Sequence, residues 1–172
     1  MTTQTLFAPT RAFPLSPSLL KAVGWSTLAV GLLDATDGVA FFGLTAGLNP
    51  IQVLQFIASG ALGTAAYSGG LASAAAGLGL HFFIAAVVAG VFTLLYQALP
   101  SVRRAWWAFG LVYGAAVWLV MNLLVVPHSA IGPSPLSTLA VVHGVVGHAL
   151  FVGLAAAWTL HYLGAQSQAG RV

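Results

Sequence analysis

Two carboxylates stand out in this sequence, because Asp34 and Asp37 are its only acidic residues and both lie inside an apolar run. Three positions is nearly one helical turn, so on a helix the two side chains share a face. An ionised group within hydrocarbon is costly unless it is paired or used in function. The polar side chains that could meet them come from other apolar runs: His81, Asn122, His143 and His148.

Several kinds of chemistry fit aspartate and histidine in such a setting. A histidine N–H that donates to an aspartate across two helices is a structural hydrogen bond of modest strength. Buried aspartate beside histidine is also the composition of proton and ion relays. A divalent transition metal could bind Asp34, Asp37, His81 and one of His143 or His148. A b-type haem held by His81 and His148 would use the same residues.

The composition is that of a membrane protein. The chain has 172 residues, of which 59% are hydrophobic and 4% are charged, whereas about 25% of the residues of a soluble domain are charged. The absence of cysteine excludes disulfides, thiolate metal ligands and a cysteine nucleophile. Five cations form no basic patch, so we expect no nucleic-acid partner.

Apolar runs that are long enough to cross a bilayer, about 20 residues each, occur four times. The spans are expected at residues 19–45, 71–98, 104–126 and 137–163. Residues 50–62 are apolar but too short to cross, and Asn49 as N-cap with Pro50 as first residue favours a short helix there, re-entrant or interfacial. The prediction is an all-α, integral membrane four-helix bundle that occupies residues 1–172 as a single domain.

The cations indicate the orientation of this bundle. In a four-span topology they all fall on one side: Arg11, Lys21, Arg103, Arg104 and Arg171. The opposite connections, residues 48–70 and 127–136, contain no lysine or arginine. Because positive residues are retained on the cytoplasmic side, we expect a multi-pass membrane protein with both termini in the cytoplasm.

The polar side chains lie at similar depths in the four spans. With a rise of 1.5 Å per residue from each cytoplasmic end, all six are roughly 22 to 30 Å deep, in the outer half of the bilayer. They therefore form one predicted polar layer: Asp34, Asp37, His81, Asn122, His143 and His148. His143 and His148 differ by about 140° on an ideal helix, so we expect only one of them to point at the aspartates.

Small residues predict where helices approach one another closely. Gly69, Ser73 and Gly77 recur at four-residue spacing at the start of the second span, and Gly110 and Gly114 do so in the third. Such rows allow close contact between helix backbones in membranes. We expect both rows to be helix-packing faces.

Residues distributed along the chain also resemble a known group of proteins. They are Gly60, Gly63, Ser68-Gly69-Gly70, His81-Phe82-Phe83, Tyr96, Tyr113-Gly114, Met121-Asn122, Pro127 and Gly147-His148-Ala149-Leu150-Phe151. This succession, within residues 34–158, resembles small uncharacterised bacterial inner-membrane proteins distantly related to the YagU-like group. The resemblance implies a multi-span inner-membrane protein and assigns no catalytic residue.

We expect a non-enzymatic activity, for which two roles stay open beside the metal or haem site. One is an accessory or assembly subunit that packs through glycine and alanine faces, in a homo-oligomer or a larger membrane complex without a cofactor. The other is a pathway for protons, ions or a small solute through the polar layer. A pathway requires a wet cavity that reaches the aspartates, whereas a packing subunit requires a dry layer and a flat face of small residues.

Overall fold

Helices make up the structure. The computed structural model describes residues 17–133 and 135–169, and within these ranges it contains helices with short connections and no strand. Four helical segments are long and apolar enough to cross a membrane: Leu19–Ala46, Gly70–Ala98, Trp106–His128 and Thr138–Leu163. Their ends lie within two residues of the predicted ones, so the all-α prediction and its four long apolar helices are confirmed. Arg11 and Arg171 lie outside the described residues.

The first two spans are continuous α-helices and the last two are interrupted. The continuous helices are α1 (Pro17–Ala46) and α3 (Gly70–Ala98). The third span comprises α5 (Trp106–Val120), the π-helical η2 (Met121–Val125) and the 3-10 helix η3 (Val126–His128). The fourth comprises α6 (Thr138–Gly147), the π-helical η4 (His148–Leu154) and α7 (Ala155–Ala169). Single π-helical turns within α-helices are frequent at functional sites.

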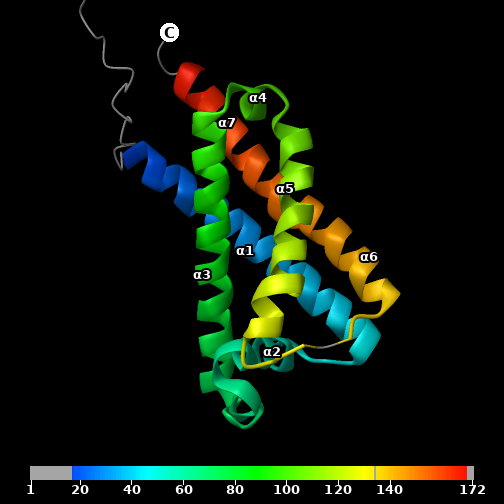
Figure 1. The fold of residues 1–172 in the computed structure, drawn as a ribbon. Coiled ribbons are helices and arrows are strands. Elements are labelled where there is room, and N and C mark those ends of the chain that lie inside the picture. The colour runs from blue at the N-terminus through cyan, green and yellow to red at the C-terminus, as the bar shows by residue number, and fades with distance from the viewer. Residues whose placement is uncertain (1–16, 134, 170–172) are drawn as a thin grey trace, which may run out of the picture.

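The two ends of the bundle differ in charge. Figure 1 shows the start of α1, the short helix α4 (Pro100–Arg104) and the end of α7 at one end. The opposite end is formed by α2 (Pro50–Leu62), the 3-10 helix η1 (Gly63–Ser68) and the connection between the last two spans. The cations among the described residues, Lys21, Arg103 and Arg104, therefore all belong to the α4 end. Arg103 donates to the carbonyl of Gln97 at 2.6 Å and so caps the last turn of α3.

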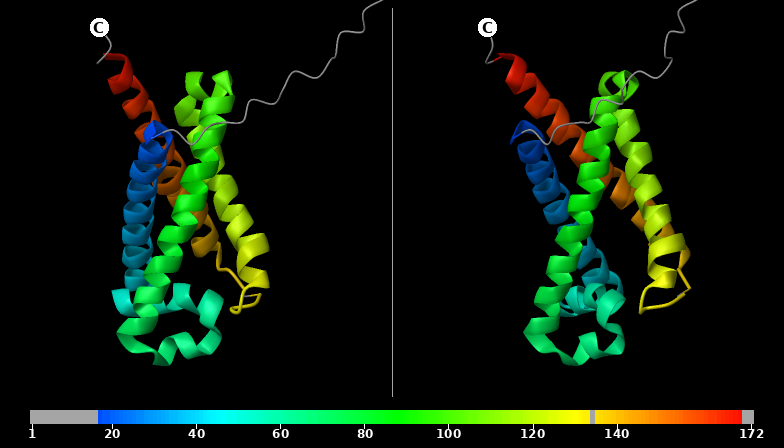
Figure 2. Two further views of the ribbon diagram at one scale, coloured as in Figure 1. Left: turned by 90° about the vertical axis from the view of Figure 1, so that its left-hand side faces the viewer. Right: turned by 60° about the vertical axis from the view of Figure 1, so that its left-hand side comes forward.

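The tightly packed core is nearer the α4 end. It includes Phe92 of α3, Val102 of α4 and Leu160 of α7, all of which are buried. The Tyr113 hydroxyl donates to the carbonyl of Val88 at 2.7 Å and ties α5 to α3. From their connection through α4, α3 and α5 diverge towards the end that α2 covers, as Figure 2 shows.

The short helix α2 begins as the sequence predicts and packs against α3. Asn49 is its N-cap, Pro50 is its first residue, and Asn49 and Gln52 form a reciprocal capping box with two 3.0 Å bonds. Gln55 is buried and donates to the Gly70 carbonyl at 3.1 Å and the Ser73 hydroxyl at 3.3 Å. These bonds hold α2 across the ends of the spans.

The small-residue rows contact helices of the same chain. A Cβ atom at Gly77 would collide with the carbonyl of Leu54 in α2, and one at Gly114 would collide with the carbonyl of His148. A Cβ atom at Gly110 would lie 2.9 Å from the carbonyl of Gly153. Close approach between α5 and η4 therefore depends on glycine.

The first residue of the predicted row in the second span lies elsewhere. Gly69 is exposed, and a Cβ atom there would meet only Ser73 of its own helix, at 2.8 Å. It follows η1 directly, before Gly70 adopts a positive φ of 56°. Gly69 thus belongs to the turn into α3, while Ser73 and Gly77 face α2.

Candidate functional site

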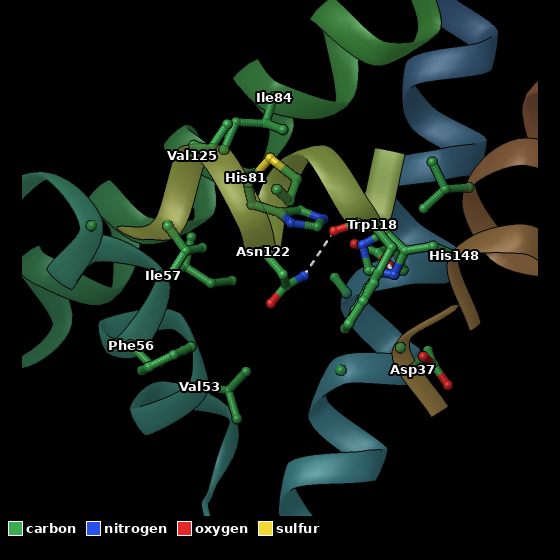
Figure 3. A pocket seen from close by; sticks show the side chains of 18 of the residues that line it. Asp37, Val53, Phe56, Ile57, His81, Ile84, Trp118, Asn122, Val125 and His148 are labelled. Carbon is green, nitrogen blue, oxygen red and sulfur yellow. Dashed lines mark hydrogen bonds and ion pairs between the residues drawn. The ribbon is translucent and has the colours of Figure 1, made fainter. Parts of the chain in front are cut away.

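A cavity of about 450 Å³ lies between the spans in the half of the bundle that α2 covers. All four spans and α2 line it. Its wall includes every side chain of the predicted polar layer: Asp34, Asp37, His81, Asn122, His143 and His148. Figure 3 shows His81 and Asn122 pointing towards the same space as Val53 and Phe56 of α2. The remaining wall is mostly apolar.

Two aspartate–histidine pairs lie in the wall, and the one nearer α2 joins α1 to α6. Oδ1 of Asp37 lies 3.3 Å from Nε2 of His143, and the Asp37 side chain keeps 19% of its surface exposed. Phe41, one turn further along α1, stacks on the His143 ring with centroids 3.8 Å apart. Gly147 makes room for this pair, since a Cβ atom there would be 2.8 Å from Oδ2 of Asp37. The carboxylate is thus held against the backbone of span four.

The second pair joins Asp34 to His148, with 3.8 Å between Oδ1 and Nδ1. This distance is too long for a direct hydrogen bond. The expectation that only one of His143 and His148 faces the aspartates is wrong. Because α1 and the fourth span are antiparallel, the later histidine lies near the earlier aspartate, and each imidazole lies within 4 Å of a carboxylate.

His81 has a different partner, which bears on the metal and haem predictions. Its Nε2 lies 2.8 Å from the carbonyl of Gly31, and a carbonyl only accepts, so this nitrogen carries a proton and donates. It cannot ligate a metal ion at the same time. Among the described residues, no three His, Asp or Glu side chains converge closely enough to hold a metal. The predicted ligand set Asp34, Asp37, His81 and His148 is therefore not assembled among the described residues.

Asn122 lies on the π-helical segment η2. Its Nδ2 donates to the carbonyl of Trp118 at 3.0 Å, which leaves the amide oxygen as an acceptor in the cavity wall. Trp118 is 6% exposed, and its indole packs against Gly144, where a Cβ atom would be 2.8 Å from Cδ1. This contact joins the third and fourth spans beside the polar layer.

Sequence reasoning missed Phe41 and Trp118 in the cavity wall, and Gly147, which lies against Asp37 outside the wall. Phe41 follows Asp37 by four positions, which places both on one helix face. Trp118 lies in the middle of a span, although membrane tryptophans are enriched at the interfaces, and that position is a signal of internal packing. Gly147 carries a weaker signal, because its role depends on a carboxylate from another helix. His128 and His161 do not line the cavity.

The fixed charges of the cavity are of one sign. Among the described residues that line it there is no lysine or arginine, and Asp34 and Asp37 are its only carboxylates. Histidine is the one lining residue type that can become positive. The described lysine and arginine side chains belong to the other end of the bundle.

The described residues form an all-helical fold with four helices apolar enough to cross a membrane, and a cavity between them has six polar side chains in a mostly apolar wall. No family model matches the chain, and no curated protein or solved structure matches it either. The resemblance to the YagU-like group stays a prediction, and function has to be inferred from the cavity.

Proposed function

We propose that the chain is a multi-pass protein of the bacterial inner membrane that binds a small solute in its cavity and forms a pathway for it. One observation carries the proposal: Asp34 and Asp37 lie in the wall of a cavity of about 450 Å³ and keep 23% and 19% of their side-chain surface exposed. Cavities of roughly 300 to 1,000 Å³ with mostly apolar walls and a few polar groups are typical ligand sites.

Insertion into a membrane is supported by the surface of the spans. In the apolar windows of the four helices only 11% to 22% of the residues are buried within the protein. Large side chains such as Val112 and Leu123 are 70% and 68% exposed. A soluble monomer rarely exposes such extensive apolar surface, and lipid would cover it. With the cations on the cytoplasmic side, α2 and the half of the bundle that holds the cavity face outwards.

An accessory role through the small-residue faces has less support. Gly77, Gly110 and Gly114 contact helices of the same chain, so these rows are not available to a partner. The polar layer also borders a cavity, where Asp34 and Asp37 keep part of their side-chain surface exposed. Both observations favour the pathway over the packing subunit.

The proposal is tested by the water access of two adjacent positions. Asn122 lines the cavity, while Leu123 is 68% exposed on the outside of the bundle. The chain has no cysteine, so Asn122→Cys and Leu123→Cys each introduce a single thiol. We expect the thiol at position 122 to react roughly tenfold faster with a small uncharged thiol reagent, because the reactive thiolate forms in water and not in hydrocarbon. Equal rates in two folded variants would refute a wet cavity.

A further inference from the structure

The polar groups of the cavity favour positive charge. Asp34 and Asp37 lie about one turn apart on α1 and both line the cavity, so both carboxylates favour a cation within it. The amide oxygen of Asn122 adds an acceptor to the same wall. No lysine or arginine among the described lining residues offers an anion a fixed partner.

The rest of the cavity wall favours a solute with an apolar body. Four aromatic side chains line the cavity: Phe41, Phe42, Phe56 and Trp118. Aromatic faces attract cations, most strongly where water is excluded. Aliphatic side chains such as Ile57 and Ile84 complete the lining. These side chains provide no polar ligands that could replace the hydration water of a strongly hydrated ion.

A bare metal ion is the less suitable cation. It requires several ligands that converge on one point, and no three His, Asp or Glu side chains do so among the described residues. The two aspartate–histidine pairs occupy successive positions along α1 and do not share a centre. An organic cation needs only a neighbouring negative charge and a surface for its carbon skeleton.

We infer that the solute is an organic cation with an apolar, aromatic-sized body, such as a lipophilic amine or onium ion, whose charge lies beside Asp34 and Asp37. The inference rests on the proposed function, since it names the solute class of the same cavity. It assigns the two carboxylates the role of binding groups. The aromatic and aliphatic wall accommodates the remainder of the molecule.

The test uses two ions of similar shape and opposite charge. Tetraphenylphosphonium and tetraphenylborate both carry four phenyl groups, so they differ chiefly in sign. With Asn122→Cys in detergent, we expect saturating tetraphenylphosphonium to slow labelling by the uncharged thiol reagent about tenfold, because a bound ligand excludes the reagent from the wall. Tetraphenylborate should leave the rate unchanged.

Charge-removing variants supply the second arm. In an Asp34→Asn/Asp37→Asn background, which keeps side-chain shape, labelling should persist and protection by tetraphenylphosphonium should disappear. Lys21→Gln, which removes a charge at the opposite end, should keep protection. If the double variant does not fold, either single Asn variant should still weaken protection severalfold.

The outcomes separate the inference from the proposed function. A thiol at position 122 that reacts rapidly while neither ion protects it, or while both protect it equally, would overturn the cation inference and leave the wet cavity intact. Undiminished protection in the Asn variants would overturn it as well. A thiol at position 122 that is no more reactive than one at Leu123 would instead refute the proposed function.

Discussion

At the scale of single residues, the aspartates are not isolated charges. Each has an imidazole nearby, Asp37 at 3.3 Å and Asp34 at 3.8 Å. Polar contacts between membrane helices are modest in energy, since the membrane-inserted reference state also finds partners. The pairs therefore orient the carboxylates in the cavity wall more than they stabilise the bundle.

A double-mutant cycle measures this contribution. We expect Asp37→Ala and His143→Ala to couple by about 0.6 kcal/mol, and by no more than about 1.7 kcal/mol, in the free energy of unfolding in detergent. The control cycle combines Asp37→Ala with His81→Ala, because His81 bonds to the Gly31 carbonyl and the two changes should be additive. A coupling as large in the control cycle would contradict the specific pair.

At the scale of helices, glycine decides where two backbones can touch. Gly77 brings α3 against the backbone of α2, and the buried Gln55 bonds the same two helices. Gly114 and Gly153 likewise allow the backbones of α5 and η4 to touch. This contact sets the position of His148 relative to the third span. Close helix contacts therefore fix the shape of the cavity.

Two alanine substitutions in α3 compare a tight glycine with an open one. At Gly77 the added methyl group would lie 2.8 Å from the Leu54 carbonyl carbon, and backbone atoms cannot yield as a flexible side chain can. We expect Gly77→Ala to lower the unfolding free energy by about 1 to 3 kcal/mol. Gly90 has no atom within 4 Å of an added Cβ, so Gly90→Ala should be neutral or stabilising by up to about 1 kcal/mol. Denaturant titration in detergent measures both, and equal effects would contradict the contact.

At the scale of the whole molecule, charge and cavity lie at opposite ends. The described cations are at the α4 end, and the cavity is in the half covered by α2. If positive residues stay in the cytoplasm, a solute reaches the aspartates from the outer side. The side from which a solute enters therefore depends on the orientation of the bundle in the membrane.

Single cysteines at the two ends test this orientation. Ser68 of η1 and Ser101 of α4 are both exposed, and the chain offers no competing thiol. In intact cells a membrane-impermeant reagent should label Ser68→Cys, whereas Ser101→Cys should be labelled only after the membrane is permeabilised. Labelling of Ser101→Cys in intact cells would reverse the proposed topology.

The sequence alone determined the features that depend on neighbours along the chain. Runs of apolar residues located the four long helices, and Asn49 with Pro50 located the start of α2. Counting residues from the helix ends placed Asp34, His81 and the other polar side chains at one depth, because rise per residue is nearly constant in a helix. These properties follow from the local sequence and do not depend on how the helices pack.

Only the tertiary structure decided what those side chains meet. Whether His143 and His148 both lie near a carboxylate depends on how α1 crosses the fourth span. A helical wheel describes one helix and gives no information on that crossing angle. The bond of His81 to the Gly31 carbonyl joins residues 50 positions apart. The cavity is lined by all four spans and α2, which meet through contacts between glycines and the backbones of distant segments. Convergence of side chains is a non-local property, which is why residue types and spacing predicted the polar layer but not its pairs or its cavity.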